Sequence, residues 1–224
     1  MTSFSSGGTS SSSDRVPPAL KKVLNLDISL TKKFVSGVER AFPVVASPAG
    51  RTYMKALEIS CHGLPWFALT LISIYLLRSI DSREVEINLL FGLIYDVMLV
   101  GFVKALTRRN RPSSNVNDDM FMTRGVDKFS FPSGHASRAV WVALFFTQWA
   151  IPEMSIIFRV LLLGWAGAVT VSRVLLRRHH LLDVAAGVGL GFAEFLLSGI
   201  LWVGPEACKW LGDWIASSED EYNG

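Results

Sequence analysis

Apolar runs separated by short polar stretches most constrain the fold of this chain of 224 residues. Half of its residues are hydrophobic, and they are gathered into runs rather than spread in periodic stripes. A helix that crosses a bilayer needs about 20 apolar residues, with roughly 17 as the lower limit. Five runs in one short chain predict an all-α, multi-pass membrane helix bundle with these spans: 59–77, 85–103, 135–151, 156–176 and 181–203.

Polar and small residues inside these runs indicate how the helices pack. Asp96 and Glu194 lie deep within their predicted spans, where an uncompensated charge is costly and usually faces protein. We expect both to face the bundle interior and to form structural polar pairs. Gly187, Gly189 and Gly191 lie in the last run, where small residues let helices approach closely.

The amino-terminal end differs in composition from the apolar runs. Residues 1–22 form a Ser-rich stretch that is typical of disorder, and we expect no cleaved signal peptide because the stretch contains no apolar segment. In residues 23–42 apolar side chains recur at every fourth position. This pattern predicts an amphipathic helix on the membrane surface, with Asp27 or Ser29 as its N-cap. An ordinary packed surface helix is the alternative.

The carboxyl-terminal end and the overall charge complete the predicted organisation. Residues 206–217 carry two tryptophans one turn apart and predict an interfacial helix, and residues 218–224 form an acidic tail. The predicted membrane-embedded domain therefore covers residues 23–217. The positive charge lies in separate patches and not along one face, which argues against a nucleic-acid partner. The two cysteines lie far apart in the chain and suggest neither a disulfide framework nor a metal site.

Residues 172–183, between the last two apolar runs, carry the most distinctive chemistry. On a helix, His179 and Asp183 would share one face, so Asp183 could accept a hydrogen bond from one ring nitrogen and leave the other free to attack. Arg173 adds a forked cation that suits an anionic oxygen. Alternatively, these are Arg and His residues that flank a membrane helix at the water surface.

A second polar patch opens the third apolar run. Ser133 is a good N-cap, and Gly134 lets an anion approach the backbone closely. A helix N-terminus offers free N–H groups and a positive dipole end, which favour phosphate. His135 follows and would be placed to donate a proton to a bound anion. A plain capped helix start with a surface histidine is the alternative.

A third patch closes the second apolar run and continues into the next loop. Lys104 and Arg111 supply two cations, and Arg111 precedes a proline that disfavours helical geometry. Arg108 and Arg109, between them, are interpreted as a positive-inside anchor. In a serpentine bundle of five spans, the loops after the second and fourth spans lie on the same side of the membrane. The three patches can therefore meet.

Together the patches contain three motifs, which are Lys-x6-Arg-Pro, Pro-Ser-Gly-His and Ser-Arg-x5-His-x3-Asp in that order. This set resembles the type-2 phosphatidic acid phosphatase superfamily, which includes lipid phosphate phosphatases, glucose-6-phosphatase and vanadium haloperoxidases. The resemblance covers about residues 63–203. A more specific resemblance is to the animal presqualene diphosphate (polyisoprenoid diphosphate) phosphatases. It is found in residues 119–123, in residues 126–131 and in the amphipathic amino terminus.

The resemblance implies a phosphohistidine mechanism that uses no metal and no other cofactor. His179 would attack phosphorus, Asp183 would orient it, and His135 would protonate the leaving oxygen and then activate water. The phosphoryl oxygens would be held by five residues: Lys104, Arg111, Ser133, Gly134 and Arg173. His180 is the rival nucleophile, disfavoured because on a helix it would lie on a different face from Asp183.

The resemblance also implies a lipid phosphate or diphosphate substrate, with isoprenoid diphosphates such as presqualene or farnesyl diphosphate favoured. A broad phosphatidate or lysophosphatidate phosphatase is the alternative among enzymes. A catalytically inactive membrane scaffold is disfavoured because no ionisable residue of the motifs is missing. A transporter is disfavoured because the chain has no internal repeat. The sequence leaves the oligomeric state open.

The distribution of Lys and Arg predicts the orientation in the membrane. With five spans, the amino terminus and the motif loops share one side, which carries fourteen Lys and Arg besides the three predicted phosphate-binding cations, against four on the other side. The positive-inside rule makes that side cytosolic. The short first and third spans favour the thinner endoplasmic reticulum bilayer. We therefore expect an endoplasmic reticulum or nuclear-envelope protein whose active site faces the cytosol.

Overall fold

The computed structural model describes residues 17–76, 80–115 and 128–211, and these residues form helices joined by loops, with no β-strand among them. The elements follow one another along the chain in this order: α1 (Pro18–Ala41), η2 (Pro43–Ala46), α2 (Pro48–Ser60), α3 (Gly63–Leu76), α4 (Ile80–Thr107), α5 (Gly134–Phe145), η3 (Phe146–Ala150), α6 (Ile156–Leu175) and α7 (Leu181–Ile200). The predicted all-α helix bundle is therefore confirmed.

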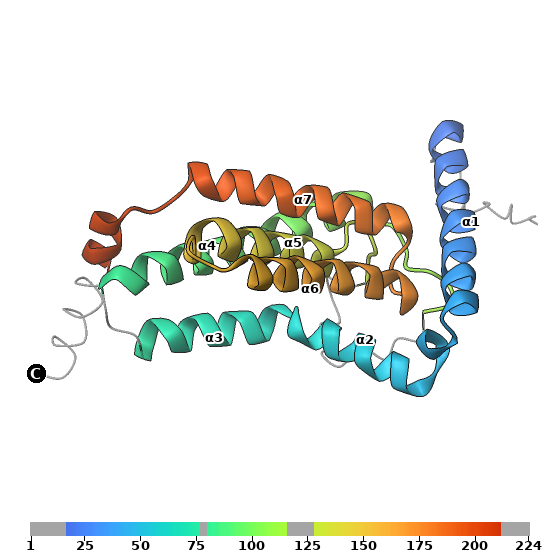
Figure 1. Ribbon diagram of the computed structural model, residues 1–224. Coiled ribbons are helices and arrows are strands. Elements are labelled where there is room, and N and C mark those ends of the chain that lie inside the picture. The colour runs from blue at the N-terminus through green and yellow to red at the C-terminus, as the bar shows by residue number, and fades with distance from the viewer. Residues whose placement is uncertain (1–16, 77–79, 116–127, 212–224) are drawn as a thin grey trace, which may run out of the picture.

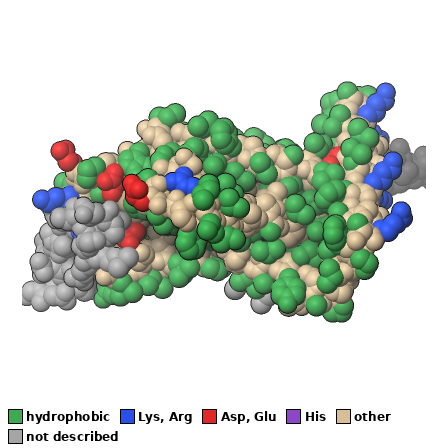
Figure 2. Space-filling model, in the orientation of Figure 1, with side chains coloured by type: hydrophobic (Ala, Val, Ile, Leu, Met, Phe, Trp, Pro, Cys, Tyr) green, Lys and Arg blue, Asp and Glu red, His purple; other side chains and the backbone are tan. Residues whose placement is uncertain are grey.

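Helix α5 occupies the interior of the bundle, with α4, α6 and α7 around it (Figure 1). Its Trp141 and Phe145 are fully buried, whereas large apolar side chains on α6 and α7, such as Phe158 and Phe192, are exposed. Hydrophobic side chains cover much of the visible surface (Figure 2). A soluble protein rarely exposes so much apolar surface, so these outer faces suit the hydrocarbon of a membrane.

The helices agree in part with the five predicted spans. Three of them are long and apolar enough to cross a membrane, α4, α6 and α7, and the bent pair α2 and α3 would make a fourth. Helix α5 continues into η3 and ends at Ala150, close to the predicted limits of 135–151, but its regular part has 12 residues. Five spans therefore stay a prediction.

The predicted first span, 59–77, does not form one straight helix. The chain breaks between α2 and α3 at Cys61 and His62, and the two helices meet at 44°. Pro65 explains the break, because proline has no N–H and its ring conflicts with the carbonyl four residues earlier. That carbonyl, on Cys61, instead accepts a hydrogen bond from Arg138 of α5 at 3.2 Å.

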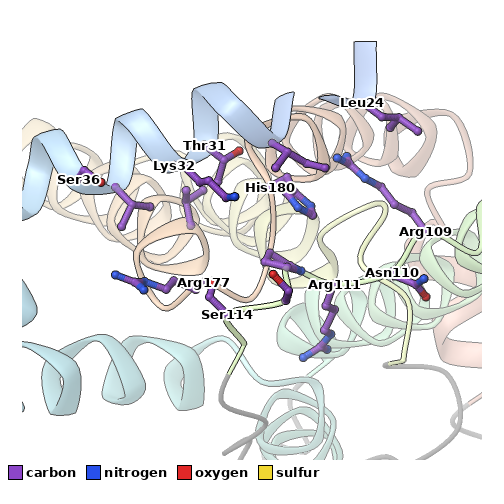
Figure 3. Close-up of a pocket in the computed structure, with 15 residues that line it drawn as sticks. Leu24, Thr31, Lys32, Ser36, Arg109, Asn110, Arg111, Ser114, Arg177 and His180 are labelled. Carbon is purple, nitrogen blue, oxygen red and sulfur yellow. The ribbon is translucent and has the colours of Figure 1, made fainter. Parts of the chain in front are cut away.

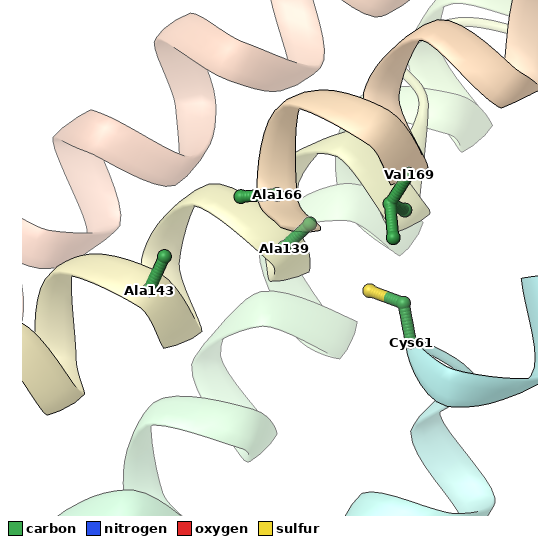
Figure 4. Close-up of a cluster of buried hydrophobic side chains, with 5 residues drawn as sticks. All are labelled: Cys61, Ala139, Ala143, Ala166 and Val169. Carbon is green, nitrogen blue, oxygen red and sulfur yellow. The ribbon is translucent and has the colours of Figure 1, made fainter. Parts of the chain in front are cut away.

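Small side chains allow close contacts between α5 and its neighbours. Ala139 and Ala143 of α5 meet Ala166 and Val169 of α6, and Cys61 closes the same cluster (Figure 4). On the other side of α5, a Cβ atom on Gly187 of α7 would lie 2.5 Å from the carbonyl oxygen of Ser133.

Of two further glycines in α7, one packs closely against α5 and the other faces open space. A Cβ atom on Gly191 would press against the backbone of Ser137, whereas one on Gly189 would meet nothing within 4 Å. The expected close contact of small residues is thus confirmed for Gly187 and Gly191 and is wrong for Gly189.

The charged residues within the bundle are paired, as expected. Asp96 is fully buried and forms an ion pair with Arg138. Glu194 is buried as well and accepts a hydrogen bond from the Ser137 hydroxyl at 2.9 Å. These contacts join α4 and α7 to the first two turns of α5, next to the motif residues at its start.

Helix α1 lies across one end of the bundle, roughly perpendicular to its long helices (Figure 1). It begins at Pro18 rather than at residue 23, with proline in the first turn, where its missing N–H costs nothing. The expected disorder of residues 1–22 is therefore wrong for residues 18–22, while residues 1–16 lie outside the described part. Asp27 falls within the helix and cannot be its N-cap.

The predicted interfacial helix at the carboxyl-terminal end is partly described. Residues 205–211 are helical and lie at the end of the bundle that is remote from α1 (Figure 1). The remainder of the predicted segment 206–217 and the acidic tail 218–224 lie outside the described residues.

Candidate active site

The three motif patches meet at the end of the bundle covered by α1. Ser130 N donates to the carbonyl of Arg109 at 2.7 Å, and Ser133 N donates to the carbonyl of Asp183 at 2.9 Å. Arg178 contacts the side chain of Asn115 at 3.4 Å. Backbone and side-chain bonds thus join the loop after α4, the start of α5 and the loop before α7.

The two loops that follow α4 and α6 leave their helices through an arginine in the left-handed conformation. Arg108 follows α4 with φ of 48°, and Arg177 follows α6 with φ of 60°. A left-handed residue ends a helix by turning the chain away from its axis, and glycine usually takes this position because a side chain adds strain. Here the turns direct the two following segments toward each other.

His179 lies in the loop before α7 and is 2% exposed. Its Nδ1 is 2.8 Å from the carbonyl oxygen of Ser130. A carbonyl only accepts hydrogen bonds, so Nδ1 carries the hydrogen and Nε2 keeps its lone pair. Burial lowers the pKa of His179 well below its usual value, and the positive charges of Arg173, Arg111 and Lys104 lower it further. The ring is therefore held in its neutral, nucleophilic form.

The expected hydrogen bond between His179 and Asp183 is wrong. Asp183 Oδ2 lies 3.9 Å from His179 Nδ1 but 3.3 Å from His180 Nδ1. The prediction assumed that one helix contains all three residues, whereas α7 begins at Leu181 and His180 is extended, with φ of −85° and ψ of 168°. The helical-face argument against His180 therefore fails, and the Ser130 carbonyl supports His179 in its place.

Asp183 is fully buried in the first turn of α7, where both of its carboxylate oxygens have partners. Oδ2 accepts from the backbone N–H of His180 at 2.8 Å, and Oδ1 accepts from Arg109 at 2.7 Å. The second nitrogen of the Arg109 fork bonds to Asp27 of α1. Arg109, interpreted from the sequence as a membrane anchor, thus belongs to the site.

The start of α5 has the predicted geometry. Ser133 caps the helix by accepting from Ala136 N at 3.4 Å. His135 follows in the first turn, and its Nε2 is buried with no hydrogen-bond partner among the described residues. A buried ring nitrogen normally has a partner, so His135 suits a ligand or water that would occupy this position. The ring of His62, from the break between α2 and α3, lies 5.9 Å away.

Buried cations surround His179. Lys104, in the last turn of α4, is 4% exposed, and Arg173, in the last turn of α6, is 1% exposed. Glu58 of α2 compensates part of this charge, because it contacts Arg173 at 3.3 Å and Arg178 at 3.4 Å. Glu58 could not be identified from the sequence, since a single glutamate in a short helix gives no signal of a long-range contact.

The residue types around His179 suit an anionic ligand rather than a metal. In the described segments no group of three or more His, Cys, Asp or Glu side chains could hold a metal ion. Fixed cations and a helix N-terminus instead offer positive charge and N–H donors to phosphoryl oxygens.

A cavity of about 580 Å³ lies beside these residues, between α1 and the motif loops (Figure 3). Leu24, Ile28 and Val35 of α1 give it an apolar wall, and Arg111 and His180 line its opposite side. Arg111 thus borders this cavity and also contributes its charge to His179. The arrangement suits an amphiphile with an anionic end.

Comparisons of the sequence with known proteins indicate one family. A protein of Arabidopsis thaliana named "Probable lipid phosphate phosphatase beta" is 36% identical over 150 residues, which cover 57% of this chain and 70% of that protein. The crystal structure of a transmembrane PAP2-type phosphatidylglycerolphosphate phosphatase from Bacillus subtilis is similar with a TM-score of 0.41 and 20% identity, over 78% of this chain and 95% of the other. The sequence model of the PAP2 superfamily matches residues 86–203, more than half of this chain. The chain therefore belongs to the PAP2 superfamily and is a membrane-embedded phosphatase.

Proposed function

We propose that this phosphatase hydrolyses lipid phosphates or diphosphates through a phosphohistidine intermediate. The observation that carries the proposal is the contact between His179 Nδ1 and the Ser130 carbonyl at 2.8 Å. This contact leaves a neutral Nε2 beside buried cations, which is what attack on a phosphorus atom requires. Phosphoryl transfer otherwise needs positioning and compensation of negative charge, and metal ions are not required where cations are already fixed.

In the first step, His179 Nε2 attacks phosphorus while the bond from phosphorus to the leaving oxygen breaks. His135 donates a proton to that oxygen, and the phosphoryl group is now on His179. In the second step His135 accepts a proton from water, whose oxygen attacks phosphorus, and the bond to Nε2 breaks. Inorganic phosphate leaves, and both histidines return to their starting states.

The remaining motif residues hold the phosphoryl group in this scheme. Its oxygens contact the cations and the first turn of α5: Lys104, Arg111, Ser133, Gly134 and Arg173. Asp183 stabilises the positive charge on His179 from 3.9 Å, without a hydrogen bond to the ring. It also fixes the loop by accepting from the backbone of His180.

An isoprenoid diphosphate is the favoured substrate, with phosphatidate as the alternative. Two observations support a substrate with an apolar chain and a phosphate end: the cavity beside Arg111 has an apolar wall on α1, and the named plant relative is called a lipid phosphate phosphatase. The more specific likeness to presqualene diphosphate phosphatases rests partly on residues 119–123 and 126–127, which lie outside the described residues.

An active site that faces the cytosol, in the endoplasmic reticulum or nuclear envelope, completes the proposal. Lys and Arg side chains gather on α1 at the end of the bundle that holds the motifs, whereas acidic side chains are concentrated at the other end (Figure 2). This distribution supports a cytosolic position for the motif end. Such a site would meet isoprenoid diphosphates made in the cytosol or at that membrane.

Phosphate release from purified protein tests the proposal, with farnesyl diphosphate and phosphatidate offered side by side. The expected result is faster release from farnesyl diphosphate, loss of activity in His179→Ala and retention of activity in His180→Ala. An active His179→Ala variant would refute the nucleophile, and faster release from phosphatidate would refute the substrate preference.

A further inference from the structure

We infer that α1 is part of the catalytic apparatus, with Asp27 and Thr31 acting as positioning residues for the loop that carries His179. This inference rests on the proposed function. Helix α1 precedes the residues that match the superfamily model, 86–203, so the family match assigns it no role.

The buried face of α1 carries two polar side chains besides Val35, whereas several of its apolar side chains are exposed. The apolar residues Leu26, Leu30 and Phe34 point outward and are exposed, whereas Asp27 and Thr31 are 3% and 7% exposed. A buried carboxylate is costly unless it is paired and hydrogen-bonded. The buried polar side chains of α1 therefore need partners, which are the start of α7 and Arg109.

The first contact is at the amino terminus of α7. The first N–H groups of a helix have no partner within it. Here Leu181 N donates to the Thr31 hydroxyl and Leu182 N donates to Asp27 Oδ1, both at 3.0 Å. Side chains of α1 thus cap a helix 150 residues later in the chain. These bonds fix the point at which the loop of His179 and His180 enters α7.

The second contact is an ion-pair bridge through Arg109. Its Nη2 lies 2.5 Å from Asp27 Oδ2, and its Nη1 lies 2.7 Å from Asp183 Oδ1. The planar guanidinium presents two donors in a fixed geometry, so the position of one carboxylate determines the position of the other. Asp27 therefore holds Asp183, and Asp183 holds the backbone of His180 beside the nucleophile.

Two substitutions separate these contacts. Asp27→Asn keeps an oxygen that can accept from Leu182 N but removes the charge that binds Arg109. Thr31→Val keeps the shape of the side chain and removes the acceptor for Leu181 N, and Thr31→Ser restores it. Glu39→Gln is the matched control, because it breaks an exposed ion pair between α1 and Arg177 without touching Asp183.

Steady-state kinetics with farnesyl diphosphate in detergent micelles tests the inference, with vanadate inhibition and thermal unfolding of each variant. We expect Asp27→Asn to lower kcat by about 100-fold, since a displacement of about 1 Å has that effect on a catalytic group. KM and vanadate inhibition should stay within about twofold of the wild type, because the phosphate-binding cations remain. Thr31→Val should lower kcat less, Thr31→Ser should restore it, and Glu39→Gln should leave it unchanged.

The outcomes distinguish the two proposals. An active wild-type enzyme whose Asp27→Asn and Thr31→Val variants keep full kcat overturns the positioning role alone. A parallel loss of kcat in Glu39→Gln overturns it too, since α1 would then act only as a tether. If Asp27→Asn does not fold, the Thr31→Val and Thr31→Ser pair decides. A wild-type protein that releases no phosphate from any lipid overturns the proposed function and the positioning role with it.

Discussion

Replacing Gly187 with alanine should damage both the stability and the active site of this phosphatase. The new Cβ atom would lie 2.5 Å from the carbonyl oxygen of Ser133. An ordinary carbon–oxygen contact is about 3.3 Å or longer, so α5 and α7 must separate by roughly 1 Å. Overpacking of this kind costs about 1–3 kcal/mol of unfolding free energy.

The same displacement acts on the site, because Ser133 N is bonded to the carbonyl of Asp183 at 2.9 Å. A separation of about 1 Å would break this bond, at a cost of about 1 kcal/mol, and would move the start of α5 away from the nucleophile. We expect kcat to fall by about 100-fold for a displacement of that size.

Gly189 offers the matched control within the same helix. An alanine there would meet nothing within 4 Å, and alanine favours a helix over glycine by up to about 1 kcal/mol. Thermal unfolding in detergent and kcat are the measurements for both variants. If Gly187→Ala and Gly189→Ala unfold at the same temperature with equal kcat, the close packing of α5 on α7 does not position the site.

Four further predictions concern charge and orientation. Chelators should leave activity unchanged and vanadate should inhibit it, because buried cations supply the positive charge; activity lost to a chelator and restored by magnesium would contradict this. The profile of kcat/KM against pH should be bell-shaped, because His179 must be neutral to attack and His135 must be protonated to donate. The lowered pKa of His179 should place the acidic limb below about 6.5. For the same reason the unfolding temperature should fall as the pH drops below about 6.5, where the unfolded chain binds a proton that the folded state excludes. In sealed microsomes, protease should cleave tags at residue 10 and within residues 115–119 without detergent; protection of the loop tag would reverse the orientation.

Features that depend on local patterns could be predicted from the sequence. Apolar runs identified α4, α6 and α7, because a helix that faces lipid must be apolar over its whole length. The cap at Ser133 was also predictable, since it depends on its own segment. The burial of Asp96 was predictable because a charge inside a membrane usually faces protein, although its partner Arg138 lies on another helix. Motif order and topology brought Lys104 and His179 to the same end of the bundle.

Contacts between distant segments could not be predicted in this way. The predicted hydrogen bond from His179 to Asp183 was wrong because the sequence does not show that α7 begins after His180 rather than before His179. Asp27, one of the two residues expected to cap its own helix, caps α7 instead, at a sequence separation of 155 residues. Pro65 can be read from the sequence, but its effect on the first span also depends on Arg138. That arginine donates a hydrogen bond to the carbonyl of Cys61, which the proline leaves without its helical partner.

The first turns of α5 show how a bundle that faces lipid can still hold a rigid site. Arg138, one turn after His135, contacts Asp96 on α4 and the carbonyl of Cys61 at the break between α2 and α3. On the opposite side, the absence of a side chain at Gly187 lets the backbone of Ser133 pack closely against α7. Three neighbouring elements thus fix the end of α5 that meets the phosphoryl group. Donors and cations that are already in place need not reorganise during the reaction, which is the main electrostatic contribution of a protein to phosphoryl transfer.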